Sequence, residues 1–422
     1  MDDLPNGFTG FAKRGSNFTV PKTSERNRGE EVPFTQEEID AIPEYQRRWS
    51  WVEIDTKAIQ HNVREARRFL RPGVRLMAVV KADGYGHGAV QCARAALSAG
   101  AEALGVATVD EGIELRKAKL NAPILILSEP PIESVPLLLG YKLQPSVYSV
   151  EFAIAYAEAA DERNMRAPYH LAVNTGMNRI GVRFDEVLPF MSRIAFHRAL
   201  DLEGTFTHFA TADMSETLDF QIQLKHFNTA LDSMRQAGIK PGIVHAANSA
   251  AIFRYSEAHF DMVRLGISLY GYHPCKETIG TVDLEPAMSV RSRITAVKTV
   301  PMSEGVSYGL NYRSPGSVMI CTIPVGYADG LKRALSGRVE FILQGRRFPQ
   351  VGNICMDQCM FEVDLRTSPT LRRVEPHVGD VVTIIGVDGD CYASVDDQAR
   401  LAGTIQHEIT IGYSHRMPRF WN

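Results

Sequence analysis

The reading of the fold depends on the stretch RLMAVVKADGYGHGAV, residues Arg75–Val90. Five of its first six residues are apolar, as expected of a strand that is buried on both faces within a parallel sheet. The strand ends in Lys81, and a loop with three glycines follows it. A lysine at the end of a buried strand loses its hydration and therefore needs a partner. The stretch predicts an α/β fold in which Lys81 has a special environment.

Seven further apolar runs follow, and helical segments separate them as far as about residue 271. The eight runs lie at 75–80, 103–108, 123–128, 143–149, 169–174, 202–208, 242–248 and 261–268. Helices are predicted at 87–99, 149–162, 184–198 and 219–237. Eight strand–helix units favour a closed (β/α)8 barrel of the TIM type. The alternative is an open, doubly wound sheet.

The composition of the chain changes at two points, which we take as domain boundaries. Residues 1–48 are polar, and we expect an extension without chemistry, with one short helix in FTQEEIDAI, where Thr35 and Glu38 have capping-box spacing. The barrel domain is predicted over 49–284. From 285 to 422 the segments are β-branched and often alternate, and Gly, Pro and Asp interrupt them, which predicts a mostly-β C-terminal domain.

The overall composition excludes several classes of function. The 422 residues include 46 basic and 49 acidic ones, so there is no net positive charge to attract nucleic acid or an anionic membrane. No apolar run approaches the roughly 20 residues of a membrane span. The N-terminus has no apolar core of the signal-peptide type, and we expect a cytoplasmic protein. The motif CMDQC lacks a second ligand pair at zinc spacing, so no metal site is expected.

Polar side chains follow five of the eight runs, at the strand ends where a barrel has its active site. These residues are Lys81, Arg179, His208, Asn248 with Ser249, and Arg264 with Gly266 and Ile267. Taken singly, most have an ordinary reading: a solvated lysine, a core histidine, a helix-capping serine. Arg264 is different, because a guanidinium that faces a barrel interior must have a partner.

Together these residues describe a pocket for pyridoxal phosphate. Ser249 supplies a hydroxyl at a helix start for a phosphate, and Arg264 is suited to a ring or an anion. A desolvated lysine such as Lys81 has a lowered pKa and forms Schiff bases readily. Pyridoxal phosphate is the cofactor that uses an amine, a phosphate site and an internal cation in this combination.

Seven motifs, in order, resemble the alanine racemases, which are pyridoxal phosphate enzymes of the fold-type III barrel. The motifs are AVVKADGYGHG, NTGMNRIGV, HAANSAA, VRLGISLYG, GVSYGLNY, PVGYADG and GNICMDQCM. The resemblance runs from about Trp51 to the C-terminus. It implies a homodimer with shared active sites that interconverts L-alanine and D-alanine, a small amino-acid substrate. It also implies a supply of D-alanine for cell-wall peptidoglycan.

The resemblance also assigns roles to single residues. Lys81 carries the cofactor and is one catalytic base, and Tyr308 of the second subunit is the other base, on the opposite face of the substrate. The residues implied around the cofactor are Lys81, Tyr85, His208, Asn248, Ser249, Arg264, Gly266, Ile267 and His407. Those implied around the substrate and the entrance are Arg179, Met356, Tyr327 and Asp357. Arg264, a donor only, leaves the pyridine nitrogen unprotonated and so disfavours transamination.

Three positions depart from the family pattern. A lysine, typically carbamylated, is common where Ala172 stands, and an aspartate where Asn174 stands. We therefore expect Arg179 to be held by Asn174 or by a bound anion such as chloride. The same pair resembles broad-spectrum racemases, so activity on serine, lysine or arginine is an alternative. His407 replaces a tyrosine on the cofactor phosphate, and a titrating histidine there predicts cofactor retention that weakens at alkaline pH.

Two further alternatives are a non-catalytic pyridoxal phosphate-binding module and a decarboxylase on the same barrel. The binding module needs neither the β domain nor Tyr308. The partner-subunit cysteine and acidic motif of the decarboxylases are not evident, whereas GVSYGLNY is intact. Both are therefore disfavoured against a racemase.

Overall fold

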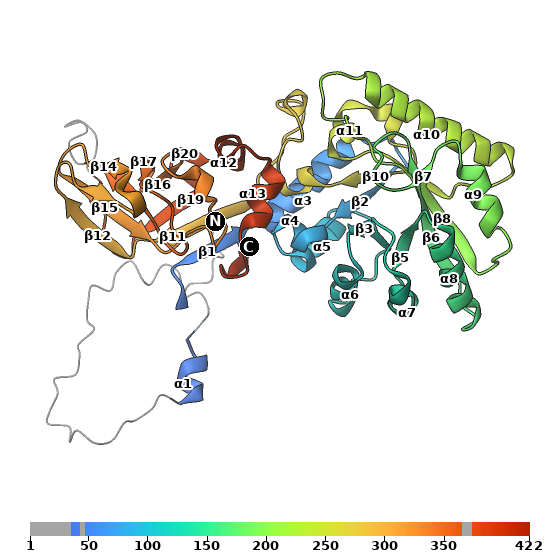
Figure 1. The fold of residues 1–422 in the computed structure, drawn as a ribbon, viewed down its shortest axis with the longest axis horizontal. Coiled ribbons are helices and arrows are strands. Elements are labelled where there is room, and N and C mark those ends of the chain that lie inside the picture. The colour runs from blue at the N-terminus through green and yellow to red at the C-terminus, as the bar shows by residue number, and fades with distance from the viewer. Residues whose placement is uncertain (1–34, 43–46, 365–373) are drawn as a thin grey trace.

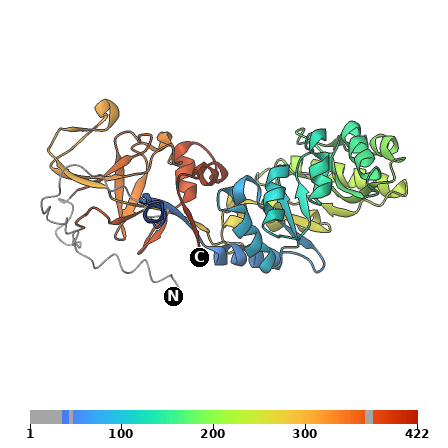
Figure 2. The same cartoon turned by 90° about the horizontal axis from the view of Figure 1, so that it is seen from below.

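The computed structural model describes residues 35–42, 47–364 and 374–422. A helix-covered barrel and a mostly-β domain lie end to end in Figure 1, and Figure 2 shows both from below. The short helix α1 (Gln36–Asp40) precedes them. The Thr35 N–H donates to Glu38 at 2.8 Å and the Glu38 N–H to Thr35 Oγ1 at 3.2 Å, which confirms the capping box. Residues 1–34 and 43–46 of the predicted extension lie outside the described residues.

Eight parallel strands form the closed barrel, as predicted. They are β2 (Arg75–Val79), β3 (Ala103–Val106), β4 (Ile124–Ile126), β5 (Gln144–Val147), β6 (Ala167–Asn174), β8 (Leu200–Phe206), β9 (Ile243–His245) and β10 (Met262–Leu265). Each pairs with the next, and β10 pairs back onto β2, so the open-sheet alternative is excluded. The short β7 (Val182–Arg183) pairs with the end of β6. Strands β3 and β4 are buried at every position, as parallel pairing under helices requires.

Helices cover the outside of the barrel. They are α3 (Thr56–Arg68), α5 (Ala89–Ser98), α6 (Val109–Lys117), α7 (Val135–Gly140), α8 (Val150–Asp161), α9 (Val187–Ile194), α10 (Leu218–Gln236) and α11 (Ser249–Arg254). The four helices predicted from the sequence correspond to α5, α8, α9 and α10. Short 3-10 turns are η2 (Ile132–Ser134), η3 (Ser256–Ala258), η4 (Ile267–Tyr270), η5 (Lys276–Thr278), η6 (Tyr308–Leu310) and η7 (Arg333–Leu335). Side-chain caps fix several starts; Ser149, for example, accepts the Phe152 N–H at 3.3 Å.

The second domain is a largely antiparallel sheet with two helices. Its strands are β11 (Met288–Arg293), β12 (Ala296–Val300), β15 (Val318–Ile323), β16 (Glu340–Leu343), β17 (Arg346–Val351), β18 (Cys359–Val363), β19 (Val381–Asp388), β20 (Cys391–Ala393) and β21 (Arg419–Trp421). A separate hairpin joins β13 (Gly305–Val306) and β14 (Tyr312–Arg313). The helices are α12 (Val395–Ala402) and α13 (Gln406–Gly412).

Strand β1 (Ser50–Ile54) belongs to this second sheet, although the sequence prediction counted it with the barrel domain, 49–284. Val52 pairs antiparallel with Val290 of β11 and parallel with Arg419 of β21. The reason for the difference is that a buried run of five residues carries no signal for which of two sheets it will join.

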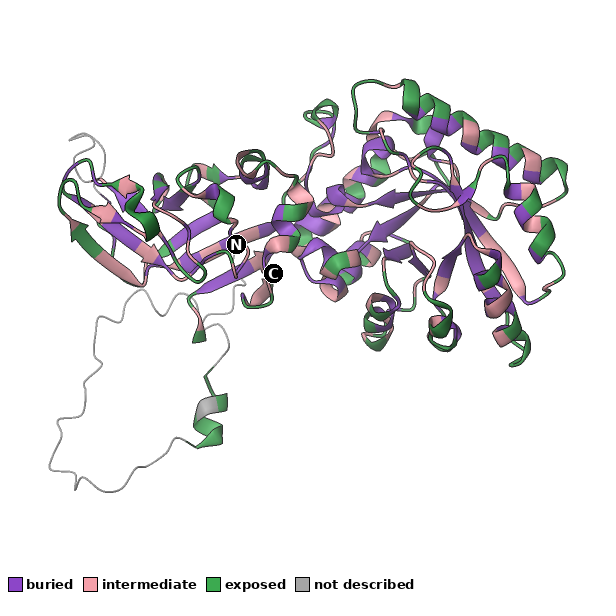
Figure 3. Ribbon diagram, in the orientation of Figure 1, coloured by how far each residue is buried: buried purple, intermediate pink, exposed green. Residues whose placement is uncertain are grey.

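The buried core is continuous through both domains. Figure 3 shows the strands buried along most of their length and the barrel helices exposed on their outer faces. Among the described helices, none has the length and apolar character needed to cross a membrane.

Candidate active site

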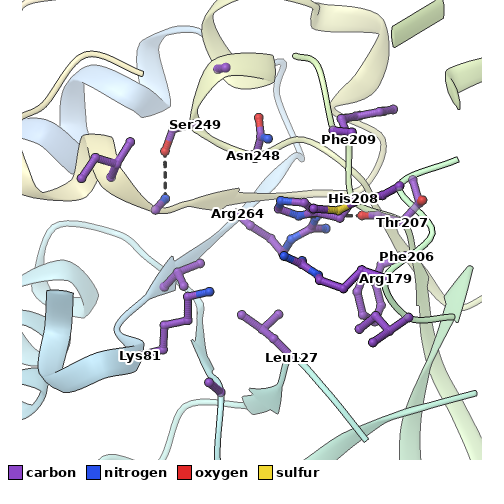
Figure 4. A pocket seen from close by; sticks show the side chains of 18 of the residues that line it. Lys81, Leu127, Arg179, Phe206, Thr207, His208, Phe209, Asn248, Ser249 and Arg264 are labelled. Atoms are coloured by element: carbon purple, nitrogen blue, oxygen red, sulfur yellow. Dashed lines mark hydrogen bonds between the residues drawn. The ribbon is translucent and has the colours of Figure 1, made fainter. Parts of the chain in front are cut away.

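A cavity of about 690 Å³ lies at the carboxyl ends of the barrel strands and extends to α13 of the second domain. The predicted residues in its wall are Lys81, Tyr85, Arg179, His208, Asn248, Ser249, Arg264, Gly266, Ile267 and His407. Figure 4 shows Lys81, His208 and Arg264 directed into a common space. Loops and strand ends far apart in the sequence are thus brought together, as expected of a barrel site.

Lys81 opens a left-handed turn, α4 (Lys81–Tyr85), directly after β2. Ala82, Asp83 and Tyr85 have φ angles of 51°, 52° and 52°. Each non-glycine residue in this conformation costs about 1–2 kcal/mol. The Gly86 N–H donates to the Ala82 carbonyl at 3.0 Å and helps to hold the turn. Because Lys81 and Tyr85 are four residues apart, about one turn, both side chains face the cavity.

The Lys81 ammonium has no hydrogen bond or ion pair with any residue that the structure describes. Burial lowers its pKa, and the positive charges of Arg179 and Arg264 lower it further, while Glu111 raises it. A lysine with a lowered pKa is neutral in a larger share of molecules and reacts more readily with an aldehyde.

Arg264 is fixed by groups of the barrel interior. Its Nη1 donates to His245 Nδ1 at 2.9 Å, and its Nη2 donates to the Thr207 carbonyl at 2.7 Å and to His208 Nδ1 at 3.2 Å. Burial, and then the charge of Arg264, lower the pKa of His208 to about 3, so this histidine is a neutral acceptor. The Nε–H of Arg264 has no partner among the described residues and can donate to a ring nitrogen.

Ser249, Gly266 and Tyr85 form a polar hollow on another side of the cavity. The side chain of Asn248 caps α11 by accepting a backbone N–H at 3.1 Å, so Ser249 is not needed as the cap. Ser249 Oγ instead accepts the Gly266 N–H at 3.0 Å and keeps its own proton for a ligand. A Cβ on Gly266 would lie 3.3 Å from the Tyr85 hydroxyl and 3.7 Å from Ser249 Oγ, so a side chain there would fill the hollow.

His407 closes this hollow from α13. Its ring lies 5.4 Å from that of Tyr85, and its Nδ1 is buried without a partner among the described residues. Burial and the charge of Lys81 lower its pKa, although Asp213 opposes the shift. The shift favours the neutral form of the imidazole. The predicted weakening of cofactor binding at alkaline pH depends on a charged histidine, and the direction of this pKa shift opposes it.

Pyridoxal phosphate fits the residues of this cavity. The hydroxyls of Tyr85 and Ser249 and the unpartnered nitrogen of His407 suit the phosphate. The free Nε–H of Arg264 suits the ring nitrogen, and the amine of Lys81 suits the aldehyde.

Arg179 lies in the loop after β6, and Asn174 does not hold it. Asn174 Oδ1 accepts the N–H groups of Gly176 and Asn178 at 3.1 and 3.0 Å, and its amide donates to Asn178. The Arg179 guanidinium has no partner in the described part of the chain. Of the two predicted ways of holding Arg179, a bound anion remains, and the small Ala172 lies in the same wall.

The remaining predicted residues lie on the second domain and do not line the cavity. They form what we call the exposed loop surface: Tyr308, Tyr327, Met356 and Asp357. Its loops are joined, because Asn353 donates to the Tyr308 carbonyl at 2.7 Å and the Tyr327 N–H donates to the Cys355 carbonyl at 3.0 Å. Tyr308 is 75% exposed and Met356 53% exposed.

Three polar residues behind the cavity wall were not predicted. His245 accepts from Arg264 and lies 2.9 Å from His170, and Glu111 binds the backbone beside Lys81. Signals for them existed in the sequence. The histidines fall inside predicted buried strands, where they need partners, and Glu111 has capping-box spacing from Thr108.

Comparisons with known families cover most of the chain. The family described as alanine racemase, N-terminal domain, matches residues 54–274, and the alanine racemase C-terminal domain matches residues 287–421. The two matches correspond to the barrel and to the second domain.

Individual relatives agree with these matches. A curated alanine racemase from Synechocystis sp. is 42% identical over 376 residues, 88% of this chain and 99% of the relative. The structure of an alanine racemase from Bacillus anthracis with bound L-Ala-P superposes with a TM-score of 0.83 at 37% identity, covering 89% of this chain and 95% of that one. A histidine racemase from Leuconostoc mesenteroides superposes at 0.80 with 26% identity, covering 89% and 98%.

Proposed function

Because this chain belongs to the alanine racemase family, we propose that it interconverts L-alanine and D-alanine with pyridoxal phosphate and two bases, Lys81 and Tyr308. The reaction is an isomerisation, as in the relatives. The observation that carries the proposal is the Lys81 amine, which has no partner among the described residues and faces the cavity. The same cavity contains the polar hollow and the free Nε–H of Arg264. When bound, pyridoxal phosphate withdraws electrons from an attached amino acid and so weakens the Cα–H bond.

Racemisation needs an acid/base group on each side of the substrate. The proton leaves one face of Cα and another proton returns on the opposite face. Lys81 approaches from the end of β2 and can serve only one face. Its lowered pKa favours proton exchange near neutrality. In our proposal Tyr308 serves the other face.

We propose that Tyr308 comes from a second copy of the chain. The loops around it expose large apolar side chains, with Met302 at 69%, Tyr308 at 75% and Leu310 at 50%. Large apolar side chains exposed together on neighbouring loops are typical of an interaction site. A two-fold dimer would bring the exposed loop surface of each chain to the cavity of the other.

Arg264 and Arg179 have separate tasks in this proposal. Arg264 donates to the ring nitrogen and, because it gives up no proton, keeps that nitrogen unprotonated and favours racemisation over transamination. Arg179, with the backbone at Met356, binds the substrate carboxylate. The resemblance further suggests that the enzyme works in the cytoplasm and supplies D-alanine for peptidoglycan.

A racemase of wider range is the second candidate. Ala172 leaves room in the cavity wall, and one structural relative is described as a histidine racemase. Racemisation rates on a panel of L-amino acids decide between the two. Equal kcat/KM values for alanine and for a long basic amino acid would overturn alanine specificity.

Reduction with borohydride tests the cofactor site. Peptide mapping is expected to find the cofactor attached to Lys81, and a label on another lysine would refute the assignment.

Mixing inactive variants tests the shared site. Lys81→Ala and Tyr308→Phe chains are unfolded together and refolded as a mixture. Random pairing gives about half mixed dimers, each with one intact site of two, so about one quarter of wild-type activity returns. Tyr392→Phe, an exposed tyrosine of the same domain, is the control and should keep full activity. No recovery in a mixture shown to contain mixed dimers would place both bases in one chain.

A further inference from the structure

We propose that Glu111 is a positioning residue for Lys81. The Glu111 carboxylate holds the backbone N–H of Ala82, next to the lysine in the chain, and places a negative charge near the lysine amine. The inference rests on the proposed function, since it concerns the same lysine. It gives a task to a side chain outside the cavity wall.

The Glu111 carboxylate connects two elements of the barrel. Its Oε1 accepts the Ala82 N–H at 2.7 Å, directly after Lys81 in the chain. Its Oε2 accepts the N–H groups of Ala107 and Thr108 at 2.7 and 3.2 Å, at the start of α6. Both oxygens are thus used, and the start of α6 is tied to the turn after β2.

The turn after β2 needs such an acceptor. The first N–H groups of a helical turn have no partner within the turn, and Ala82 adopts a φ of 51°, which is unfavourable for alanine. A hydrogen bond to a carboxylate is stronger than one to a neutral acceptor. Because Ala82 is bonded to Lys81, a shift of this N–H would move the lysine directly.

The charge of Glu111 also acts on the amine. Besides Glu111, the titratable groups of the cavity around Lys81 are Tyr85 on α4, Arg179 after β6, His208 and Asp213 after β8, Arg264 on β10 and His407 on α13. Asp83 and Glu114 are the acidic groups near Glu111. Burial, Arg179 and Arg264 lower the pKa of Lys81, whereas Glu111 raises it. Glu111 therefore limits how far the pKa of the lysine falls.

Glu111 also belongs to a capping box, which would be a purely structural role. The box consists of the Thr108 contacts, in which Thr108 Oγ1 accepts the Glu111 N–H at 3.3 Å. The contact of Oε1 with Ala82 reaches a different element and is not part of it. Thr108→Ala removes half of the box without touching Ala82 and is therefore the matched control.

The first test measures Lys81 without cofactor. Full-length wild-type, Glu111→Gln and Thr108→Ala chains react with an amine-acylating reagent over a range of pH, and peptide mapping quantifies the label on Lys81. The pH of half-maximal labelling is expected to fall in Glu111→Gln and to stay unchanged in Thr108→Ala. An unchanged or higher midpoint in Glu111→Gln, or equal midpoints in the two variants, would overturn the proposal.

The second test measures kinetics after loading with pyridoxal phosphate. In Glu111→Gln, kcat is expected to fall by roughly 10-fold to 100-fold, as when the partner that orients a functional group is removed. KM for alanine should stay unchanged because Arg179 is untouched. A wild-type kcat in Glu111→Gln would refute the positioning role.

A second variant keeps the proposal testable if Glu111→Gln does not fold. Glu111→Asp retains the charge but is too short to reach Ala82 and Ala107 together. Its labelling midpoint should stay near that of the wild type while kcat falls, and wild-type kcat in this variant would show that the contact with Ala82 is not needed. If borohydride reduction finds no cofactor on wild-type Lys81, the proposed function fails, but the labelling midpoints still decide the effect of Glu111.

Discussion

Gly86 packs against the second domain, and its replacement by alanine gives the most direct test of how the two domains share the cofactor site. Its φ is +83°, and a Cβ there would lie 2.4 Å from the Thr410 carbonyl oxygen and 3.2 Å from Ile411 Cα. Both of these are backbone atoms of α13, the helix that carries His407. Alanine at this position must therefore push α13 away from the barrel.

Two contributions set the size of the effect of Gly86→Ala. The left-handed conformation costs about 1–2 kcal/mol for a residue with a Cβ. Forcing the backbone of α13 aside costs about 1–3 kcal/mol. We expect a loss of about 2–5 kcal/mol in the free energy of unfolding. In our proposal His407 binds the cofactor phosphate, so its displacement would also remove a hydrogen bond worth about 1.5–3 kcal/mol, or about 10-fold to 100-fold in cofactor affinity.

Gly238→Ala is the matched control for this experiment. Gly238 has a φ of +76°, but a Cβ there has nothing within 4 Å, so only the conformational cost applies. Urea unfolding measures the stability of both variants, and visible absorbance during titration with pyridoxal phosphate measures affinity. Equal destabilisation of the two variants, together with unchanged cofactor affinity in Gly86→Ala, would refute the reasoning.

Three further predictions concern charges. The cofactor dissociation constant is expected to stay flat from pH 7 to pH 9, because burial lowers the pKa of His407 and so favours its neutral imidazole in that range. A fluorescence titration that shows weaker binding with rising pH would contradict this. Replacing chloride by a large organic anion is expected to raise KM for alanine, because Arg179 then loses the anion that holds it. Ala172→Glu supplies a carboxylate in the same cavity wall and should abolish this effect. A wild-type KM that does not change with chloride concentration would contradict the prediction. Arg48→Ala is expected to cost about 3 kcal/mol in urea unfolding, because the fully buried Asp329 carboxylate then keeps, among the described residues, only the Gly326 N–H and, as a cation, the more distant Arg416. A cost near zero would show that the pair of Arg48 and Asp329 contributes little.

The barrel and most of its site were predictable because both depend on strong local signals. Strands buried on both faces have nearly continuous apolar sequences, and a polar residue at the end of such a strand stands out, as Lys81 and Arg264 do. The parallel barrel then brings those strand ends to one face. Position in the chain was thus enough to place these residues in one cavity.

Other features were set by contacts that no short segment encodes. The left-handed turn at Ala82 and Asp83 opposes the preference of both residues and persists because Glu111 and the following glycines support it. The role of Asn248 as the helix cap, rather than Ser249, depends on one residue of register. The separation of Tyr308 from the cavity shows only in three dimensions, and a second copy of the chain is the proposed remedy.

The pairing of β1 with β21 has a consequence for biosynthesis. Val52 and Arg419 are neighbours in the sheet but 367 positions apart in the chain, taking 419 minus 52. During translation β1 is made well before its parallel neighbour, so one edge of β1 stays unpaired and open to association while the residues between the two strands are synthesised. Because His407 on α13 also follows the whole barrel in the chain, the wall that it adds to the candidate pocket forms only after all eight barrel strands have been synthesised.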